Sequence, residues 1–235
     1  MTVSSEVAKV PPAVRDRLAL AFDVSDLSVA LPMAKLLAPY FAVAKVGLEL
    51  FVAAGPAAVA ALRDEGFVVF LDLKLHDIPT TVLRAATRAR AIGATYLTVH
   101  GAGGEAVLMA GVTGFGEGPG GILAVTVLTS ERHASPELIA GRAALADTTG
   151  CAGFVCAASD LAVARRAAPE LLATVPGIRL AGSENDDQAR AATPRVAAAA
   201  GAGLMVVGRT VTAAADPEAA AQRVVDEVVA GSASA

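Results

Sequence analysis

Eight short apolar runs follow one another along the chain, and each is followed by a stretch with the pattern of a helix. The third run, Phe-Val-Val-Phe-Leu, is rich in β-branched and aromatic residues, which is typical of a strand buried on both faces of a parallel sheet. The eight runs occupy residues 18–22, 41–46, 67–71, 96–99, 122–127, 154–156, 171–175 and 204–207. Alternating strands and helices predict a parallel sheet, and eight such units in 235 residues favour a closed α/β barrel, the (β/α)8 or TIM barrel.

This rhythm runs through the chain without a linker or a short sequence repeat. We therefore expect one barrel domain over residues 1–235, with a loose N-terminal arm over 1–14 and a frayed tail over 231–235. The pattern G-x-G-x-x-G does not follow the first apolar run, which argues against a doubly wound dinucleotide-binding sheet.

Residues that commonly cap helices mark several of the expected helix starts. Ser25 or Asp26 is expected to begin the first helix after the first strand, and Ser135 the helix after the fifth strand. Asp186 and Asp187 are expected near the start of the helix that precedes the eighth strand, because acidic residues complement the helix dipole there.

Charge and hydropathy exclude two classes of partner. The net charge is −4 and the chain has no basic run, which argues against nucleic acid bound to a large basic surface. The mean hydropathy is high, +0.57, but the longest stretch without Asp, Glu, Lys or Arg has 14 residues, fewer than the roughly 17 that a spanning helix needs. The N-terminal residues also lack the apolar core of a signal peptide. We expect a cytoplasmic protein that does not bind membranes.

The two cysteines, Cys151 and Cys156, do not have the spacing of a zinc site or a redox C-x-x-C motif. We expect both to be buried as small apolar side chains. So few cysteines are typical of a reducing compartment such as the cytosol.

The third apolar run ends abruptly in charged residues, Asp72, Lys74, His76 and Asp77. On a strand, Asp72 and Lys74 would face the same side, because side chains alternate with a period of two. Charges at the mouth of a buried strand are costly unless they are paired or used in chemistry. Either an ordinary Asp–Lys ion pair or a catalytic group fits this stretch taken alone.

The ends of the other strands add more polar residues. In an α/β barrel the carboxyl ends of the strands carry the active site. The candidates at that end are Asp23, Lys45, Asp72, Lys74, Asp77, His100, Thr129, Ser130, Arg179, Gly208 and Arg209. Gly208 and Arg209 suggest a phosphate site, with Arg179 and Gln188 as further donors, since barrels often bind phosphate after strands seven and eight. Alternatively, Arg209 would form an ion pair with a carboxylate on the surface and would not bind phosphate.

Residues 72–81, Asp-Leu-Lys-Leu-His-Asp-Ile-Pro-Thr-Thr, resemble the signature of the orotidine 5′-phosphate decarboxylase family. Further matches keep the same order from about residue 18 to 217. They are Ala-Phe-Asp-Val at 21–24, Lys-Val-Gly-Leu-Glu at 45–49, Val-Thr-Val-Leu-Thr-Ser at 125–130, Pro-Gly-Ile-Arg at 176–179, Asp-Gln at 187–188 and Val-Gly-Arg at 207–209. The resemblance is specific because D-x-K-x-x-D occurs together with a lysine on the second strand.

The resemblance implies an enzyme that converts orotidine 5′-phosphate to uridine 5′-phosphate and carbon dioxide, the last step of de novo pyrimidine nucleotide synthesis. It implies no metal and no organic cofactor. Lys45, Asp72, Lys74 and Asp77 would form a network of alternating charges, and Lys74 would deliver a proton to C6 of the pyrimidine. The family forms homodimers with shared sites, in which Asp77 would serve the partner's site.

The resemblance also implies how the substrate is bound. Asp23 and Lys45 would hold the ribose, and Thr129 would contact the pyrimidine ring. The groups implied for the 5′-phosphate are Arg179, Gln188, Gly208 and Arg209. Ile78 and Thr81 would reach the ligand of the partner subunit.

The chain departs from the family pattern at three positions. Thr80 stands where Asn is usual, Val175 stands where Thr often precedes Pro-Gly, and Asp187 replaces a common Gly and would stiffen the phosphate loop. No role is implied for His76 or His100, for which we expect structural hydrogen bonds to neighbouring strands.

Two alternatives remain open. A related barrel, an Mg²⁺-dependent sugar-phosphate decarboxylase or hexulose-phosphate aldolase, shares D-x-K-x-x-D but has a metal-binding Glu where this chain has Lys45, whose charge would repel a cation. The other alternative is a non-catalytic barrel that binds a nucleotide monophosphate. Such a protein would be expected to lack Lys74 or one of the aspartates, whereas this chain has all four charges.

Overall fold

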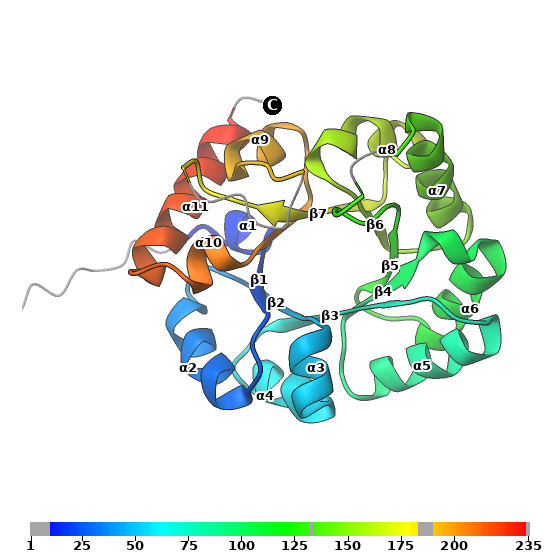
Figure 1. Ribbon diagram of the computed structural model, residues 1–235, viewed down its shortest axis with the longest axis horizontal. Helices are drawn as coiled ribbons and strands as arrows, with labels where there is room; N and C mark the ends of the chain where they lie inside the picture. Colours follow the sequence, from blue (N-terminus) through cyan, green and yellow to red (C-terminus); the bar gives the residue numbers. More distant parts are fainter. Residues whose placement is uncertain (1–9, 132–133, 183–189, 234–235) are drawn as a thin grey trace, which may run out of the picture.

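The computed structural model describes residues 10–131, 134–182 and 190–233. Eight parallel strands close into a barrel in sequence order, with β8 paired to β1 (Figure 1). The strands are β1 Leu18–Phe22, β2 Val43–Val46, β3 Val68–Leu75, β4 Tyr96–His100, β5 Gly121–Val125, β6 Gly153–Val155, β7 Leu172–Ile178 and β8 Leu204–Val207. The TIM-barrel prediction is therefore confirmed.

Helices surround the barrel on its outer side (Figure 1). The α-helices are α1 Pro12–Arg15, α2 Leu27–Leu37, α3 Leu48–Ala54, α4 Pro56–Asp64, α5 Pro79–Ala91, α6 Glu105–Phe115, α7 Pro136–Thr148, α8 Leu161–Ala167, α9 Pro194–Ala199, α10 Arg209–Thr212 and α11 Pro217–Ser232. Two short 3₁₀ turns, η1 Gly101–Gly103 and η2 Ala158–Asp160, follow β4 and β6. Among the described residues, no helix is long and apolar enough to span a membrane.

Two apolar clusters hold these layers together. The larger one lies between the strands and the helices, and it includes Phe22, Phe41 and Phe154. The smaller one fills the inside of the barrel. Its buried members are Ala19, Ala21, Ala42, Val43, Phe70, Leu123, Val125, Val155, Leu204 and Val206. The inner cluster makes the barrel a packed core, so an active site has room only above it, where the strands end.

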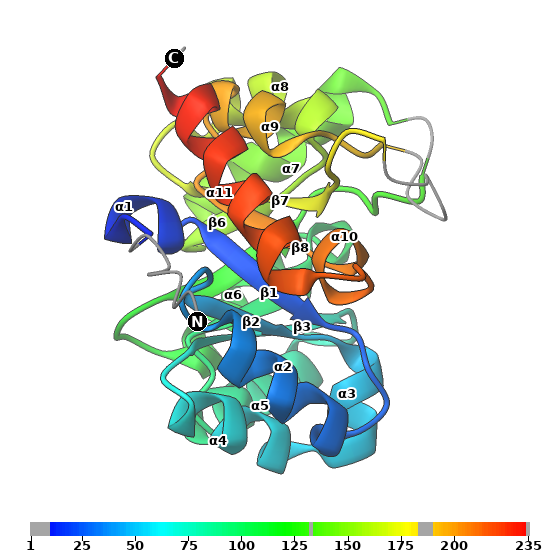
Figure 2. The same ribbon diagram turned by 90° about the vertical axis from the view of Figure 1, so that its left-hand side faces the viewer.

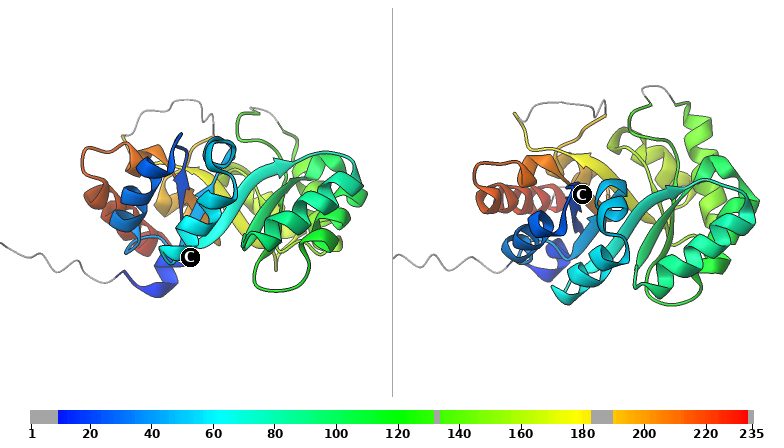
Figure 3. Two further views of the ribbon diagram at one scale, coloured as in Figure 1. Left: turned by 90° about the horizontal axis from the view of Figure 1, so that it is seen from below. Right: turned by 60° about the horizontal axis from the view of Figure 1, so that its bottom comes forward.

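The opposite end of the barrel is covered by α1, which lies away from α3 and α10 (Figures 2 and 3). The carbonyl of Arg15, the last residue of this helix, and that of Arg17 accept hydrogen bonds from the N–H groups of Ala42 and Met205, respectively. Residues 12–15 are thus helical, which differs from the expected loose arm. At the other terminus α11 reaches Ser232, two residues into the expected frayed tail.

Helix caps agree with the sequence at two places. The side chain of Asp26 accepts a hydrogen bond from the N–H of Ser28, and that of Ser135 from the N–H of Leu138. Asp186 and Asp187 lie outside the described residues. The helix before β8 is described from Pro194, where Thr193 caps it.

Both cysteines are buried and free, as expected. Burial raises the pKa of the Cys151 thiol to about 11, opposed by a hydrogen bond with Thr149. Burial, with the nearby charge of Asp160, raises the pKa of the Cys156 thiol to about 12. Both thiols therefore remain protonated near neutral pH.

Candidate active site

A cavity of about 590 Å³ opens at the carboxyl ends of the strands. The inner apolar cluster forms its floor through residues such as Phe70, Val125 and Val155. Its lining includes polar positions from six different strand ends: Asp23, Lys45, Asp72, Lys74, Thr129, Ser130, Arg179, Gly208 and Arg209. The residues that the sequence predicted for one site are therefore brought together, with the exceptions given below.

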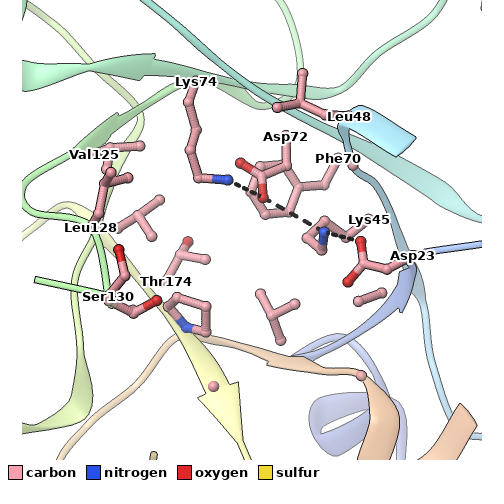
Figure 4. Close-up of a pocket in the computed structure, with 18 of the residues that line it drawn as sticks. Asp23, Lys45, Leu48, Phe70, Asp72, Lys74, Val125, Leu128, Ser130 and Thr174 are labelled. Atoms are coloured by element: carbon pink, nitrogen blue, oxygen red, sulfur yellow. Dashed lines mark hydrogen bonds and ion pairs between the residues drawn. The ribbon is translucent and has the colours of Figure 1, made fainter. Parts of the chain in front are cut away.

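Four charged side chains form a continuous row along one wall of this cavity (Figure 4). The Nζ of Lys45 is 2.9 Å from Oδ1 of Asp23 and 3.6 Å from Oδ2 of Asp72. The same Oδ2 of Asp72 is 2.8 Å from Nζ of Lys74. The signs alternate along β1, β2 and β3, so each charge is next to charges of opposite sign.

The row is fixed because its centre is buried. The side chains of Lys45 and Asp72 are only 10% and 13% exposed. Burial by itself raises the pKa of Asp72, but the charges of Lys45 and Lys74 and hydrogen bonds from Lys74 and Thr98 together hold that pKa below its usual value. Asp72 is therefore a carboxylate at neutral pH, and its charge can orient both ammonium groups.

Gly47 makes room for the same row. A Cβ at this position would lie 2.7 Å from Oδ1 of Asp23 and 3.0 Å from Nζ of Lys45. Any larger residue would therefore push against the Asp23–Lys45 ion pair, so packing explains the glycine that directly follows β2.

The third strand departs from regular geometry where its charges lie. Its pairing with β4 shifts between Leu71 and Leu75. Lys74 has φ +50°, and no other described residue except glycine has a positive φ. Such a backbone is unfavourable for a residue with a side chain, by about 1–2 kcal/mol. The strand also extends through Leu75, four residues beyond the apolar run from which it was predicted.

Arg179 and Arg209 lie on the side of the cavity formed by β7 and β8. Arg179 is buried, and its Nη1 donates to the carbonyl of Ile178 at 3.2 Å. Gly208 precedes α10, whose first residue is Arg209. The two guanidinium groups, one directly after β7 and one at the start of α10, could bind an anion together. Gln188, the other predicted phosphate ligand, lies outside the described residues.

Asp77, Ile78 and Thr81 are exposed and do not line this cavity. Asp77 Oδ1 accepts a hydrogen bond from the N–H of Ile78 at 2.7 Å. Ile78 is 66% exposed, which is unusual for an isoleucine. Of the four predicted network residues, the structure thus joins Lys45, Asp72 and Lys74 within one chain, and Asp77 remains apart.

His76 and His100 stack on one another, with ring centroids 5.1 Å apart and an angle of 18° between the planes. Nδ1 of His100 accepts a hydrogen bond from the N–H of Ala102 at 3.1 Å, so its bond is to its own turn and not to a neighbouring strand. Burial, followed by the proximity of His76 and Arg142, lowers the pKa of His100. This histidine is therefore neutral at physiological pH.

Two features of the site were missed from the sequence. Thr98 is fully buried on β4, and its hydroxyl contacts the charged row. Arg190 pairs with the buried Asp160 and also donates from Nη2 to the carbonyl of Leu128 at 3.1 Å. Arg190 thereby connects the segment after β7 to the segment that carries Thr129. Local sequence patterns could not reveal either contact, since each joins residues far apart in the chain.

Comparison with known proteins identifies the family. The orotidine 5′-phosphate decarboxylase / HUMPS family model matches residues 16–224. The orotidine 5′-phosphate decarboxylase of Anaeromyxobacter sp. (strain K) is 48% identical over 220 residues, which are 89% of this chain and 96% of that protein. The enzyme of the same name from Moorella thermoacetica is 41% identical, over 91% of this chain and 92% of that protein. A crystal structure of orotidine 5′-phosphate decarboxylase from Lactobacillus acidophilus covers 91% of this chain and 99% of its own, with a TM-score of 0.75 and 31% identity. The chain belongs to the orotidine 5′-phosphate decarboxylase / HUMPS family.

Proposed function

We propose that this protein converts orotidine 5′-phosphate to uridine 5′-phosphate and carbon dioxide, the last step of de novo pyrimidine nucleotide synthesis. The observation that carries the proposal is the row Asp23–Lys45–Asp72–Lys74, with contacts of 2.9, 3.6 and 2.8 Å. A fixed ammonium at the end of such a row suits a reaction in which negative charge develops at one carbon atom.

In this proposal the two ends of the cavity bind different parts of the substrate. Arg179, Arg209 and the backbone at Gly208 bind the 5′-phosphate, with Gln188 as a further ligand. Asp23 and Lys45 bind the ribose hydroxyls, and Thr129 contacts the pyrimidine ring. Binding energy from the remote phosphate holds C6 of the ring next to Lys74.

Lys74 acts on the carbon that loses carbon dioxide. The bond between C6 and the carboxylate breaks, and its electron pair stays on C6 as a carbanion. The Nζ of Lys74 stabilises this charge and transfers a proton to C6, which gives uridine 5′-phosphate. The neutral amine then regains a proton from water. Asp72 keeps Lys74 protonated and oriented, so little reorganisation is required as charge develops.

The position of Lys45 argues against a metal-dependent reaction. Its ammonium lies between the carboxylates of Asp23 and Asp72, which are the oxygen ligands that Mg²⁺ prefers. Lys45 therefore supplies the positive charge that a metal would supply in the related sugar-phosphate enzymes. We propose that the enzyme requires neither a metal nor an organic cofactor.

We further propose that the single barrel domain acts in the cytoplasm as a homodimer with shared sites. Asp77, Ile78 and Thr81 would each reach the ligand of the partner. The exposed apolar residues Leu48 and Val52, at 56% and 81%, lie one turn apart on α3, and Leu48 lines the cavity. They support an interface beside the cavity, because large exposed apolar residues in a group often mark interfaces.

An ultraviolet assay of purified protein with orotidine 5′-phosphate, in excess EDTA, tests the proposal. We expect turnover that is unchanged when Mg²⁺ replaces EDTA. Turnover only with Mg²⁺ would favour the metal-dependent alternative. Binding of uridine 5′-phosphate without any turnover in either buffer would favour the non-catalytic nucleotide-binding barrel.

A further inference from the structure

A bulge on β3 places two charged residues opposite a single residue of β4. Residues 72–74 lie between two regular pairs of the β3–β4 ladder, and only Thr98 lies opposite them. Bulges of this kind leave backbone groups without a ladder partner and redirect side chains, and they are frequent beside active sites. Thr98 is fully buried, so its hydroxyl needs protein partners.

The hydroxyl of Thr98 makes two hydrogen bonds whose directions are fixed by chemistry. The backbone N–H of Lys74 can only donate, and it donates to Oγ1 of Thr98 at 2.8 Å. The hydroxyl hydrogen is then directed to Oδ1 of Asp72 at 3.0 Å, because an ionised carboxylate only accepts. One side chain thus holds both the backbone of Lys74 and the carboxylate of Asp72.

These two bonds hold the carboxylate of Asp72 and the backbone of Lys74 in place. The carboxylate of Asp72 has its Oδ1 on Thr98, which leaves Oδ2 facing Lys74 and Lys45. The left-handed backbone of Lys74, with φ +50°, is held by its N–H bond to Thr98. Without the hydroxyl, the carboxylate could rotate and the lysine backbone could relax.

We propose that Thr98 is a positioning residue for decarboxylation, which sets the rotation of the Asp72 carboxylate and the backbone of Lys74 and so directs the ammonium to C6. The inference rests on the proposed function, because it concerns the same reaction. In this proposed role Thr98 does not touch the substrate. Its effect is therefore on the chemical step and not on the binding of the nucleotide.

Thr126 offers a matched comparison on β5's carboxyl side. It is also a fully buried threonine, and its hydroxyl donates to the carbonyl of Val155 at 2.8 Å. Thr98→Val and Thr126→Val remove the same group at the same depth and keep almost the same shape. A purely structural role for Thr98 predicts similar effects of the two substitutions on activity.

The experiment compares Thr98→Val, Thr98→Ser and Thr126→Val with the wild-type protein. We expect kcat of Thr98→Val to fall roughly 10- to 100-fold, the effect of a small misplacement of a reacting group. Affinity for uridine 5′-phosphate should change by less than about threefold, because phosphate and ribose are held elsewhere. Thr98→Ser, which keeps the hydroxyl, and Thr126→Val should both retain kcat within about threefold. Equal kcat values for the two valine variants would overturn the inference.

Two further measurements separate positioning from stability. The acid limb of the kcat/KM profile should move to higher pH in Thr98→Val, since its hydrogen bond helps to lower the pKa of Asp72. Exchange of the C6 proton of uridine 5′-phosphate in D₂O, the reverse of proton delivery, should slow in parallel with kcat. Exchange at the wild-type rate, or an unmoved acid limb, would contradict a positioning role.

The wild-type protein is assayed first. An inactive wild type refutes the proposed function, whereas an active wild type with an equally active Thr98→Val refutes only this inference. Where Thr98→Val does not fold, Thr98→Cys takes its place, because a thiol is a weak donor of similar size. A kcat at least about tenfold below that of Thr98→Ser supports the inference. A kcat equal to that of Thr98→Ser overturns it.

Discussion

The ammonium of Lys74 lies 2.8 Å from the carboxylate of Asp72, although the strand that carries both residues is bulged between them. Regular alternation would place both side chains on one face, and the bulge then adjusts where the longer one points. The carboxylate also attracts Lys45 at 3.6 Å. The fold thus provides a preset electrostatic environment at the carboxyl ends of β2 and β3.

Replacement of Lys74 by alanine should abolish turnover and preserve nucleotide binding. We expect kcat to fall by at least about 10³-fold, because the variant loses both the charge that stabilises the carbanion and the proton that quenches it. Calorimetric titration should still detect uridine 5′-phosphate. Lys35→Ala, which removes an exposed lysine 3.5 Å from Glu65, is the control and should change neither quantity. Turnover of Lys74→Ala near the wild-type rate would exclude Lys74 as the proton donor.

Acid should destabilise the fold partly through Asp72. The pKa of this carboxyl is lowered in the folded state, so its stabilising effect is complete above the unfolded pKa of about 3.9 and is lost as the pH falls toward the folded pKa. Below about pH 4, the free energy of unfolding should decrease by up to about 1.4 kcal/mol per pH unit because of this group. Urea denaturation between pH 6 and pH 2.5 measures the slope.

The asparagine variant isolates that contribution. Asp72→Asn should be less stable than the wild type at pH 7, since two ammonium groups lose their shared partner, and its stability should depend less on pH in the acid range. Asp64→Asn, at an exposed position at the end of α4, should keep the wild-type slope. An identical acid slope in Asp72→Asn would show that the carboxyl is not ionised in the fold.

Mixed dimers test whether the sites are shared. Lys74→Ala and Asp77→Ala should each be nearly inactive alone. If Asp77 serves the partner's site, a heterodimer has one site with both changes and one intact site. Random exchange makes half of the dimers mixed, so about a quarter of the wild-type activity should return. Mixed dimers detected by native mass spectrometry without recovered activity would place Asp77 in its own subunit's site.

The Arg190–Asp160 ion pair should contribute much more than a surface pair. Both side chains are nearly buried, at 12% and 10% exposure. Arg190→Met should lower the free energy of unfolding by about 3 kcal/mol, because it leaves a buried carboxylate without its partner. Lys35→Met breaks the exposed pair with Glu65 and should cost less than about 1 kcal/mol. Chemical denaturation measures both values.

A double variant tests whether that loss comes from the pair itself. Arg190→Met combined with Asp160→Asn should be more stable than the sum of the single effects implies, since no lone buried charge remains. Additive losses would instead assign the cost to packing of the arginine side chain.

Strand positions were predictable because each strand is a local pattern. A parallel strand buried on both faces needs a short run of apolar residues, and runs such as 18–22 and 204–207 coincide with β1 and β8. The barrel then determines where the strand ends meet, so Asp23, Lys45 and Asp72 could be placed together before any distance was known. The short helices α3 and α10 were not predicted, because seven and four residues are too few to show a helical period.

Contacts that depend on register could not be predicted in the same way. The continuation of β3 through Lys74 depends on a bulge that the apolar pattern does not encode. Thr98 looked like an ordinary strand residue, and its role follows only from the shift that sets it opposite residues 72–74. Arg190 meets Asp160 across 30 positions of sequence, so their pairing depends on the closed barrel.

The positive φ of Lys74 lowers stability at a position whose side chain is needed for activity. Glycine is the residue best suited to that backbone, and it would release conformational strain while removing the ammonium. The same change would leave the buried carboxylate of Asp72 without its nearest ammonium, so the strain released and the ion pair lost have opposite effects on the free energy of unfolding. The strained backbone at position 74 is therefore kept, because the residue that would relax it has neither the charge that pairs with Asp72 nor the proton that the reaction needs.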